Sequence, residues 1–389
     1  MTHLAVMLSV AIVAAPPRCL EPSPARGQSA AVLVDRGPLV HTGQVFPAGP
    51  AFAPTPPAEQ VTQAFSRLGD VLLDADARLS EAVKINVYVR HPSVMPLVEK
   101  ELSRRFPGDH RPAVSYVQTA LPDEAVVVAV DAVAPAAASD QATVKRARLP
   151  ASDRPAPAAV LPSGSVSYIS GQAEKGDGTL ADATKQTMAS LFRTLEFLGS
   201  APADVVHMKA FLTPMSDSAT AVKEMAAAFG EAVCPPVSLV EWVSSTPIEI
   251  ELVVAARRPE GDVPPLEYLT PPGMTASPVY ARVVRIHASR SLYVSGLYGA
   301  TDAPHSAAEV RDLFATLTRV LQQGGSDLKH LAKATYYVSD PEPSRLLNTL
   351  RPEYYDPLRP PAASKAQVIG TGQPSRSITL DMIAVPREE

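Results

Sequence analysis

Cysteine is scarce in this sequence, and neither sign of charge dominates it. Cys19 and Cys234 are the two cysteines in 389 residues, and no CxxC or clustered Cys/His pattern has zinc spacing. A disulfide scaffold and a structural zinc site are therefore disfavoured, and no metal or other cofactor is predicted. Lys and Arg (35) fall short of Asp and Glu (40), which gives a net charge of −5. Because the chain has no overall positive charge to attract phosphate groups, we do not expect nucleic acid as a partner.

Long hydrophobic runs are also missing, apart from a short one near the start. Leu4 to Ala15 is twelve apolar or small residues, whereas a membrane span needs about 20. The length suits a signal peptide, but no Lys or Arg precedes the run and Pro16-Pro17-Arg18 follows it. Residues 1–30 are therefore either a signal peptide of an exported, periplasmic protein or a disordered extension of a cytoplasmic one. No membrane partner is expected.

What the sequence does contain is one pattern repeated three times. An apolar strand ends in a hydroxyl residue and a glycine at Thr42-Gly43, Ser170-Gly171 and Ser295-Gly296. About forty residues later a second strand is entered through Lys84, His207 or Lys333, of which His207 is read as structural. A third element follows a proline, and a final apolar strand closes each copy. Ordered recurrence at matched spacing predicts three tandem units.

Between these strands lie segments whose apolar residues recur at helical spacing. In the third copy the apolar positions Val310, Leu313, Phe314, Leu317, Val320 and Leu321 form one stripe. A shorter helix follows the second strand of each copy, so the predicted unit is β-β-α-β-α-β-β, of the α+β class. Two helices cover one face of the sheet, and the other face needs a neighbouring unit.

Composition shifts mark the boundaries of the units. Forty prolines against twenty glycines indicate many loops and linkers, and Pro-rich stretches separate the copies. The expected organisation is an extension (1–30), unit 1 (31–134), a Pro/Ala-rich linker (135–161), unit 2 (162–258), a second linker (259–273) and unit 3 (274–389).

These motifs resemble the RidA/YjgF family of reactive intermediate deaminases, once called L-PSP endoribonucleases. The carriers are the [ST]-G-Q turns at Thr42 and Ser170, the VK-x-x-VY strand from Val83 and the P-A-x-S-x-x-Q-V element from Pro361. Members are typically homotrimers with ligand clefts between subunits. The resemblance implies an intramolecular pseudo-trimer, a monomeric chain and clefts for a small-molecule metabolite between its units.

The resemblance also indicates where the site lies and which of the family's site residues this chain has replaced. Deaminating members bind the substrate carboxylate with an arginine of the P-A-R-[ST] element, and this chain has Val114, Val237 and Ala363 there. The glutamate that handles the attacking water is matched by Glu249 in copy two, while Ala129 and Thr379 stand in the other copies. Thr42, Ser170, Ser295 and Asn348 are the remaining expected ligand contacts.

Each of these residues has a structural alternative. Glu249 lies in an alternating strand whose polar positions face solvent equally well. The hydroxyls of Thr42, Ser170 and Ser295 also suit turns. Cys234 is expected to be a buried, inert thiol.

Two classes of function follow. The first is an atypical or degenerate family member that binds a small metabolite in clefts between its units. The second is an active enamine or imine deaminase in which Glu249 is the acid/base residue. An endoribonuclease is a weaker alternative because of the negative net charge. No G-x-S-x-G, HExxH, GxGxxG or P-loop motif supports another enzyme class.

Overall fold

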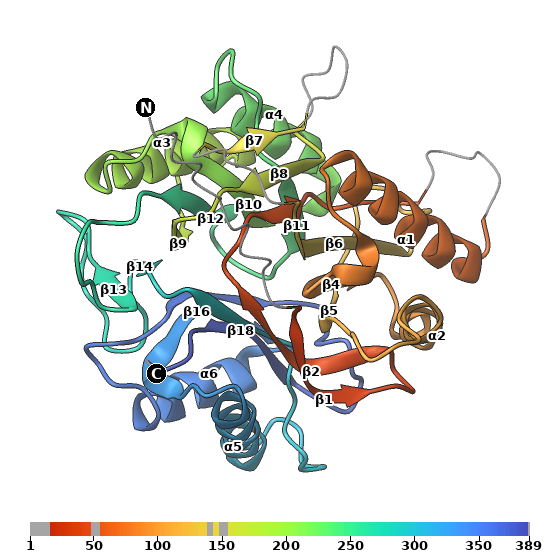
Figure 1. Cartoon of the computed structure of the whole chain (residues 1–389). Coiled ribbons are helices and arrows are strands. Elements are labelled where there is room, and N and C mark those ends of the chain that lie inside the picture. Colours follow the sequence, from red (N-terminus) through yellow and green to blue (C-terminus); the bar gives the residue numbers. More distant parts are fainter. Residues whose placement is uncertain (1–15, 48–54, 138–142, 148–154, 388–389) are drawn as a thin grey trace, which may run out of the picture.

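The computed structural model of the chain describes residues 16–47, 55–137, 143–147 and 155–387 (Figure 1). The apolar run from Leu4 to Ala15, considered above as a signal peptide, lies outside these residues. Within the described ranges, no helix is long and apolar enough to cross a bilayer.

Each of the three units has the predicted order of elements. Unit 1 contains β2 (Gln28–Asp35), β3 (Leu39–Thr42), α1 (Pro57–Asp74), β4 (Lys84–Val89), α2 (Met95–Arg105), β5 (Ala113–Gln118) and β6 (Val128–Pro135). Unit 2 contains β8 (Ala158–Leu161), β9 (Ser165–Gln172), α3 (Leu180–Phe197), β10 (Val205–Leu212), α4 (Ser218–Ala228), β11 (Val237–Glu241) and β12 (Ile248–Ala256). Unit 3 contains β14 (Val283–Ile286), β15 (Arg290–Val294), α5 (Ala307–Gln323), β16 (Leu331–Val338), α6 (Pro341–Leu350), β17 (Ala362–Gln367) and β18 (Ile378–Ala384). The α+β class and the β-β-α-β-α-β-β order are confirmed.

Several strands fall in stretches that the sequence analysis assigned to the extension or to linkers. They are β1 (Arg18–Ser23) and the start of β2 within 1–30, β7 (Lys145–Arg146) and β8 within 135–161, and β13 (Leu266–Leu269) within 259–273. The unit boundaries shift accordingly. β1 and β7 are mostly polar, whereas β8 and β13 bury Leu161 and Leu266 in the core shared between units. All are short, so hydrophobic periodicity detects them poorly.

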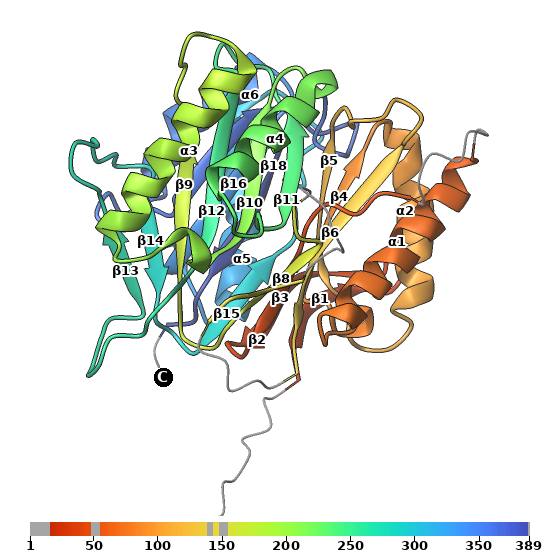
Figure 2. The ribbon, with the colours of Figure 1, turned by 90° about the horizontal axis from the view of Figure 1, so that it is seen from above.

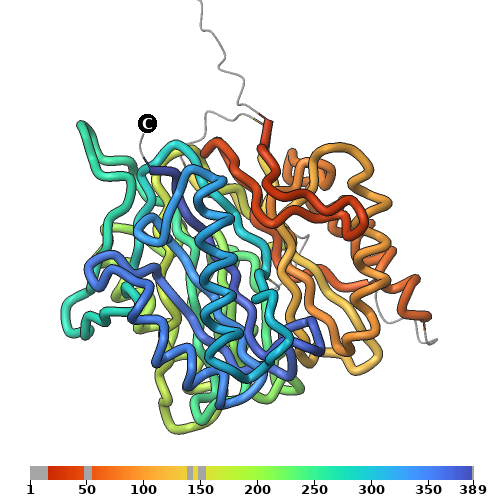
Figure 3. The backbone as a smooth tube through the Cα atoms, turned by 90° about the horizontal axis from the view of Figure 1, so that it is seen from below, coloured from red at the N-terminus to blue at the C-terminus, as the bar shows by residue number. Residues whose placement is uncertain are grey.

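The first strand of each unit pairs with a neighbouring unit instead of with its own second strand. Strand β2 of unit 1 pairs antiparallel with β15 of unit 3, β8 of unit 2 with β3 of unit 1, and β14 of unit 3 with β9 of unit 2. Figure 3 shows the red N-terminal strands lying between the first and third units. Unit 1 gives its first strand to unit 3, unit 2 gives its first strand to unit 1, and unit 3 gives its first strand to unit 2. The three units therefore form a closed ring.

The pairings make two sheets. The larger has the order β17-β16-β18-β15-β2-β5-β4-β6-β3-β8-β7, with β1 on β2, and the smaller has the order β11-β10-β12-β9-β14-β13. Helices lie on the outside of both sheets (Figure 2). The stripe of α1, with Val61, Phe65 and Leu68 among its buried residues, faces the sheet of unit 1.

The inner faces of the sheets meet in a shared centre. One apolar cluster joins Val32, Val166 and Tyr293, and another joins Tyr88, Phe211 and Tyr337, with one member from each unit in both cases. The rings of Phe211 and Tyr337 lie 6.4 Å apart between their centroids. The sheet face that the helices leave uncovered is therefore buried by the other units.

Candidate functional site

Three equivalent interfaces join the units, and each brings a turn glycine against a strand of the neighbouring unit. The backbone N–H of Val114 donates to Ser295 Oγ at 2.8 Å, that of Ala363 donates to Ser170 Oγ at 2.7 Å, and that of Gln44 donates to the Val237 carbonyl at 3.0 Å. At two interfaces the turn hydroxyl thus contacts the position expected to hold arginine, and at the third the backbone of Gln44, two residues after Thr42, does so.

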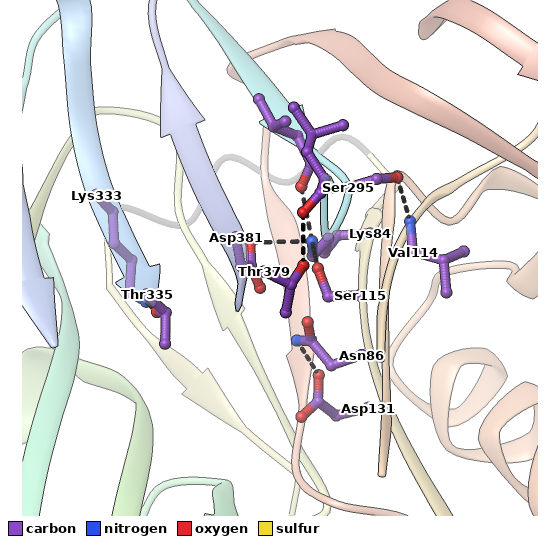
Figure 4. Close-up of polar contacts among 12 residues, drawn as sticks. Lys84, Asn86, Val114, Ser115, Asp131, Ser295, Lys333, Thr335, Thr379 and Asp381 are labelled. Carbon is purple, nitrogen blue, oxygen red and sulfur yellow. Dashed lines mark hydrogen bonds and ion pairs between the residues drawn. The ribbon is translucent and has the colours of Figure 1, made fainter. Parts of the chain in front are cut away.

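The interface between units 3 and 1 is closed by its own hydrogen bonds (Figure 4). Besides accepting from Val114, Ser295 Oγ donates to the carbonyl of Ser29 at 2.5 Å. Thr379, at the position expected to hold the glutamate, donates to the carbonyl of Leu297 at 2.8 Å. Both hydroxyls are therefore satisfied within the protein. A groove of about 420 Å³ lies at the edge of these two units, lined by residues that include Arg26, Met95, Glu99 and Gly372.

The interface between units 1 and 2 is sealed by the side chain of Gln44. Its amide nitrogen donates to the carbonyl of Leu239 at 3.2 Å, and its amide oxygen accepts from the Leu239 N–H at 3.3 Å. Thr42 Oγ1 accepts from the backbone N–H of Ala132, in its own unit. Since Ala129 occupies the glutamate position and is fully buried, this interface has no acid/base group there.

The interface between units 2 and 3 is chemically different, because a carboxyl group and an amine remain near its turn glycine. Glu249 is partly buried on β12, and a Cβ atom placed on Gly171 would lie 2.0 Å from its Oε1. The carboxyl group thus occupies the space that this glycine leaves open. Lys365 on β17 donates from Nζ to Oδ1 of Asn348 on α6, at 3.0 Å. Four of the predicted residues, Ser170, Glu249, Asn348 and Ala363, belong to this interface.

Electrostatics distinguish this site further. Burial raises the pKa of the Glu249 carboxyl to about 7; the neighbouring Glu251 acts in the same direction, and Ser364 and Lys365 oppose it. Burial, reinforced by Arg351, lowers the pKa of Lys365, while Glu249 opposes this shift. A carboxyl with a pKa near neutrality can both give and take a proton.

Inside the interfaces lies a ring of buried charge that pairs each unit with the next. Lys84 Nζ lies 2.9 Å from Asp381 Oδ1, and Lys333 Nζ lies 2.8 Å from Glu251 Oε1. The third link is a relay in which Ser238 Oγ donates to Asp131 Oδ2 at 2.6 Å and lies 3.1 Å from His207 Nε2. Figure 4 shows Lys84 between Asp381 and Ser115. Lys84 on β4 and Lys333 on β16 thus hold neighbouring units together, and His207 on β10 contacts Ser238, which makes the third link.

The protonation states in this ring follow from burial and from charge pairing. Burial lowers the pKa of His207 to about 3, and Lys209 and Lys333 add to this, so its imidazole is neutral at pH 7. Burial alone would raise the pKa of Asp381, but Lys84, Lys209 and Lys333 bring it below its ordinary value. The structural role expected for His207 agrees with this arrangement.

The family of the chain is decided by three matches to one sequence model. The model for endoribonuclease L-PSP matches residues 20–136, 151–256 and 274–385, one match for each unit. The chain belongs to the endoribonuclease L-PSP family. The resemblance to RidA/YjgF proteins is thereby confirmed, with three tandem copies in one chain.

Solved structures similar to this L-PSP family chain each correspond to about one unit. The YjgF-family protein NMB1025 from Neisseria meningitidis is 21% identical, with 32% of this chain and 97% of that chain covered and a TM-score of 0.25. The Rid-family protein YyfB from Yersinia pestis is 24% identical, covering 31% of this chain and 98% of that one, with a TM-score of 0.28. Rv2704 from Mycobacterium tuberculosis is 26% identical over 27% of this chain and 85% of its own, with a TM-score of 0.23. No curated protein matches the chain.

Sequence reasoning missed one residue of the site in this L-PSP family chain. Lys365 lies two residues after Ala363 on β17, and alternate residues of a strand face the same side. The corresponding residues of the other units are Tyr116 and Leu239. Comparison of the three copies at this position would have found the lysine. Among the described residues, no group of three His, Cys, Asp or Glu is placed to hold a metal ion.

The raised pKa of Glu249 predicts a pH-dependent contribution to the stability of this family member. Its ordinary value is 4.5, so between about pH 4.5 and 7 the unfolded chain loses the proton while the folded chain keeps it. Glu249 therefore destabilises the fold progressively as the pH rises. We expect Glu249→Gln to raise the melting temperature at about pH 8 and to raise it much less at about pH 5, measured by calorimetry. An equal gain at both values would contradict the raised pKa.

Proposed function

We propose that this chain is an atypical member of its family that binds one small metabolite at the interface between units 2 and 3. The observation that carries the proposal is the convergence there of a carboxyl group, an amine and a carboxamide, from Glu249, Lys365 and Asn348. At the equivalent positions of the other interfaces, alanine or threonine replaces the glutamate, and leucine or tyrosine replaces the lysine. Ser170 and Gly171 lie beside these groups, and Ser170 Oγ accepts from the Ala363 N–H and donates to the Ala281 carbonyl at 2.6 Å.

The residues at the three positions where the family has arginine support an atypical ligand rather than the standard one. Val114, Val237 and Ala363 cannot form charge-assisted hydrogen bonds to a carboxylate. Val114 is fully buried and Val237 is 8% exposed, so these side chains serve the apolar cores of their units. The small side chain of Ala363 is partly exposed at the interface that we propose as the site.

A thermal-shift screen of the full chain tests this proposal, with pyruvate, 2-oxobutyrate and the neutral amide pyruvamide as probes. We expect at least one probe to raise the melting temperature, and Glu249→Gln or Lys365→Met to remove the shift. Thr379→Val changes the residue equivalent to Glu249 at another interface and is the matched control, which should keep the shift. Absence of any shift, or equal shifts in the two site variants and the wild type, would overturn the proposal.

A second candidate function is hydrolysis of an imine or enamine, favoured by the near-neutral pKa of Glu249. Each missing charge-assisted hydrogen bond is worth about 1.5–3 kcal/mol, so turnover of 2-iminobutyrate should be at least about tenfold slower than in a relative with the arginine. Glu249→Gln should then lower the remaining rate by about 10²–10⁴-fold. Turnover that Glu249→Gln leaves unchanged would exclude this candidate.

We do not propose ribonuclease activity, because the net charge is −5.

We also infer that the chain is a monomer in solution. The strand exchange gives every unit its pairing partner within the same chain. Light scattering after size exclusion should therefore give a mass of one chain, 41.1 kDa.

A further inference from the structure

A cysteine and a histidine form a pair far from the proposed ligand site. Cys19 lies on β1, and His110 lies in the loop between α2 and β5, with 3.6 Å between Sγ and Nδ1. The other ring nitrogen, Nε2, lies 2.8 Å from the carbonyl oxygen of Ala82. Because a carbonyl only accepts hydrogen bonds, Nε2 carries the proton in the neutral ring. Nδ1 is then free to take the proton of the thiol.

The surroundings of the sulfur favour its ionised form. The backbone N–H of Arg111 donates to Sγ at 3.2 Å, and the protonated thiol donates to the Arg111 carbonyl, also at 3.2 Å. Burial alone would raise the pKa of Cys19, but His110, the Arg111 backbone and Ser29 bring it below its ordinary value. Burial alone would lower the pKa of His110, yet Cys19, Ala82 and Glu81 raise it. Opposite shifts in two adjacent groups are those of a thiolate beside an imidazolium.

A buried hydroxyl group, that of Ser29, lies next to the sulfur. Ser29 is 1% exposed, and its Oγ makes no hydrogen bond at normal distance. It lies close enough to Cys19 to lower the pKa of the thiol. A buried donor without a normal hydrogen bond is unfavourable, and an oxygen atom added to the sulfur would give it an acceptor.

The second cysteine of the chain provides an internal reference. Cys234 is 4% exposed, and burial raises the pKa of its thiol to about 12. Cys19 is partly exposed. The two thiols of one chain therefore differ in both access and ionisation.

We propose that Cys19 is an oxidation site at which its sulfur reacts with hydrogen peroxide to give a sulfenic acid. The thiolate sulfur attacks one peroxide oxygen, a sulfur–oxygen bond forms and the oxygen–oxygen bond breaks. Sulfur loses two electrons and the peroxide gains them. The departing hydroxide takes the proton from His110 and leaves as water, and the Ser29 hydroxyl donates to the new sulfenate oxygen.

The test uses the full chain, hydrogen peroxide and dimedone, which traps sulfenic acids, with peptide mass spectrometry to locate the adduct. We expect the adduct on Cys19 and not on Cys234. His110→Gln should slow its formation at about pH 7 by about tenfold for each pKa unit that the thiol regains. His330→Gln, which changes a histidine paired with Asp327 elsewhere, is the matched control and should leave the rate unchanged.

Equal labelling of the two cysteines would overturn the proposal, as would an unchanged rate in His110→Gln. Should that variant fail to fold, the pH dependence of iodoacetamide alkylation decides the question in the wild type. Half-maximal alkylation of Cys19 below about pH 8.5, the value of a free thiol, supports the pair. A midpoint at or above that value contradicts it.

Discussion

Replacing Lys84 with methionine is expected to lower the free energy of unfolding by about 3–5 kcal/mol, the cost of leaving one member of a buried ion pair without its partner. Lys84 is 3% exposed and Asp381 is 8% exposed, so water cannot take over the role of the lysine. The variant also removes the donor to Ser115 Oγ at 2.6 Å and to the Val294 carbonyl at 2.7 Å. Urea unfolding followed by circular dichroism measures the loss.

The control for this variant is an ion pair in water. Arg345 lies 2.6 Å from Glu342 on the exposed face of α6, where solvent screens the interaction, so Arg345→Met should leave the unfolding curve unchanged. The double variant Lys84→Met with Asp381→Leu should recover most of the loss, because an apolar pair of similar volume leaves no buried charge. A single variant as stable as the wild type would show that Lys209 and Lys333 suffice to neutralise Asp381.

Deleting residues 1–35 is expected to make the chain insoluble, although the described part of the deleted segment contains no helix. Strand β2 lies inside the larger sheet, between β15 of unit 3 and β5 of unit 1. Its removal exposes the pairing edge of β15 and the apolar side chains that pack on Val32 and Leu33. Open edges of this kind aggregate. The measurement is the soluble fraction after expression, followed by size exclusion.

A synthetic peptide of residues 16–35 provides the matched test. Added during refolding, it should restore a soluble complex in which peptide and truncated chain elute together, whereas a scrambled peptide should not. A truncated chain that stays soluble, monomeric and cooperatively folded without the peptide would show that β2 is dispensable and that the ring does not depend on strand exchange.

The sequence supported the fold further than it supported the site. Apolar stripes such as Val310 to Leu321 report which face of a helix is buried, and their recurrence defined three units with the observed order of elements. Alternation along a strand also fixes its buried face, but it does not identify the strand alongside. For that reason the exchange of β2, β8 and β14 between units was beyond sequence reasoning.

The residues of the candidate site could be predicted within each unit, but the grouping of residues from two units could not. Ser170 and Glu249 come from unit 2, and Asn348 and Ala363 come from unit 3, so their grouping depends on which units are neighbours and in which direction. The hydroxyls of Thr42, Ser170 and Ser295 all make hydrogen bonds within the protein, and their role as ligand contacts stays a prediction. Lys365 lies two residues beyond the position of the absent arginine, and no motif of the sequence points to it.

Strand exchange also determines when the protein can finish folding during synthesis. The side chain of Arg36, just after β2, donates to the carbonyl of Ile286, 250 residues later, and β2 itself pairs with β15 beyond that point. At about 5–20 residues per second, the ribosome needs about 12–50 s after synthesising β2 to reach its partner β15. During that interval the edge of β2 that pairs with β15 stays open, whereas its other edge pairs with β1 in a local hairpin. The N-terminal segment therefore has the longest wait and the greatest need of chaperone protection, while unit 2 can assemble most of its sheet from its own residues.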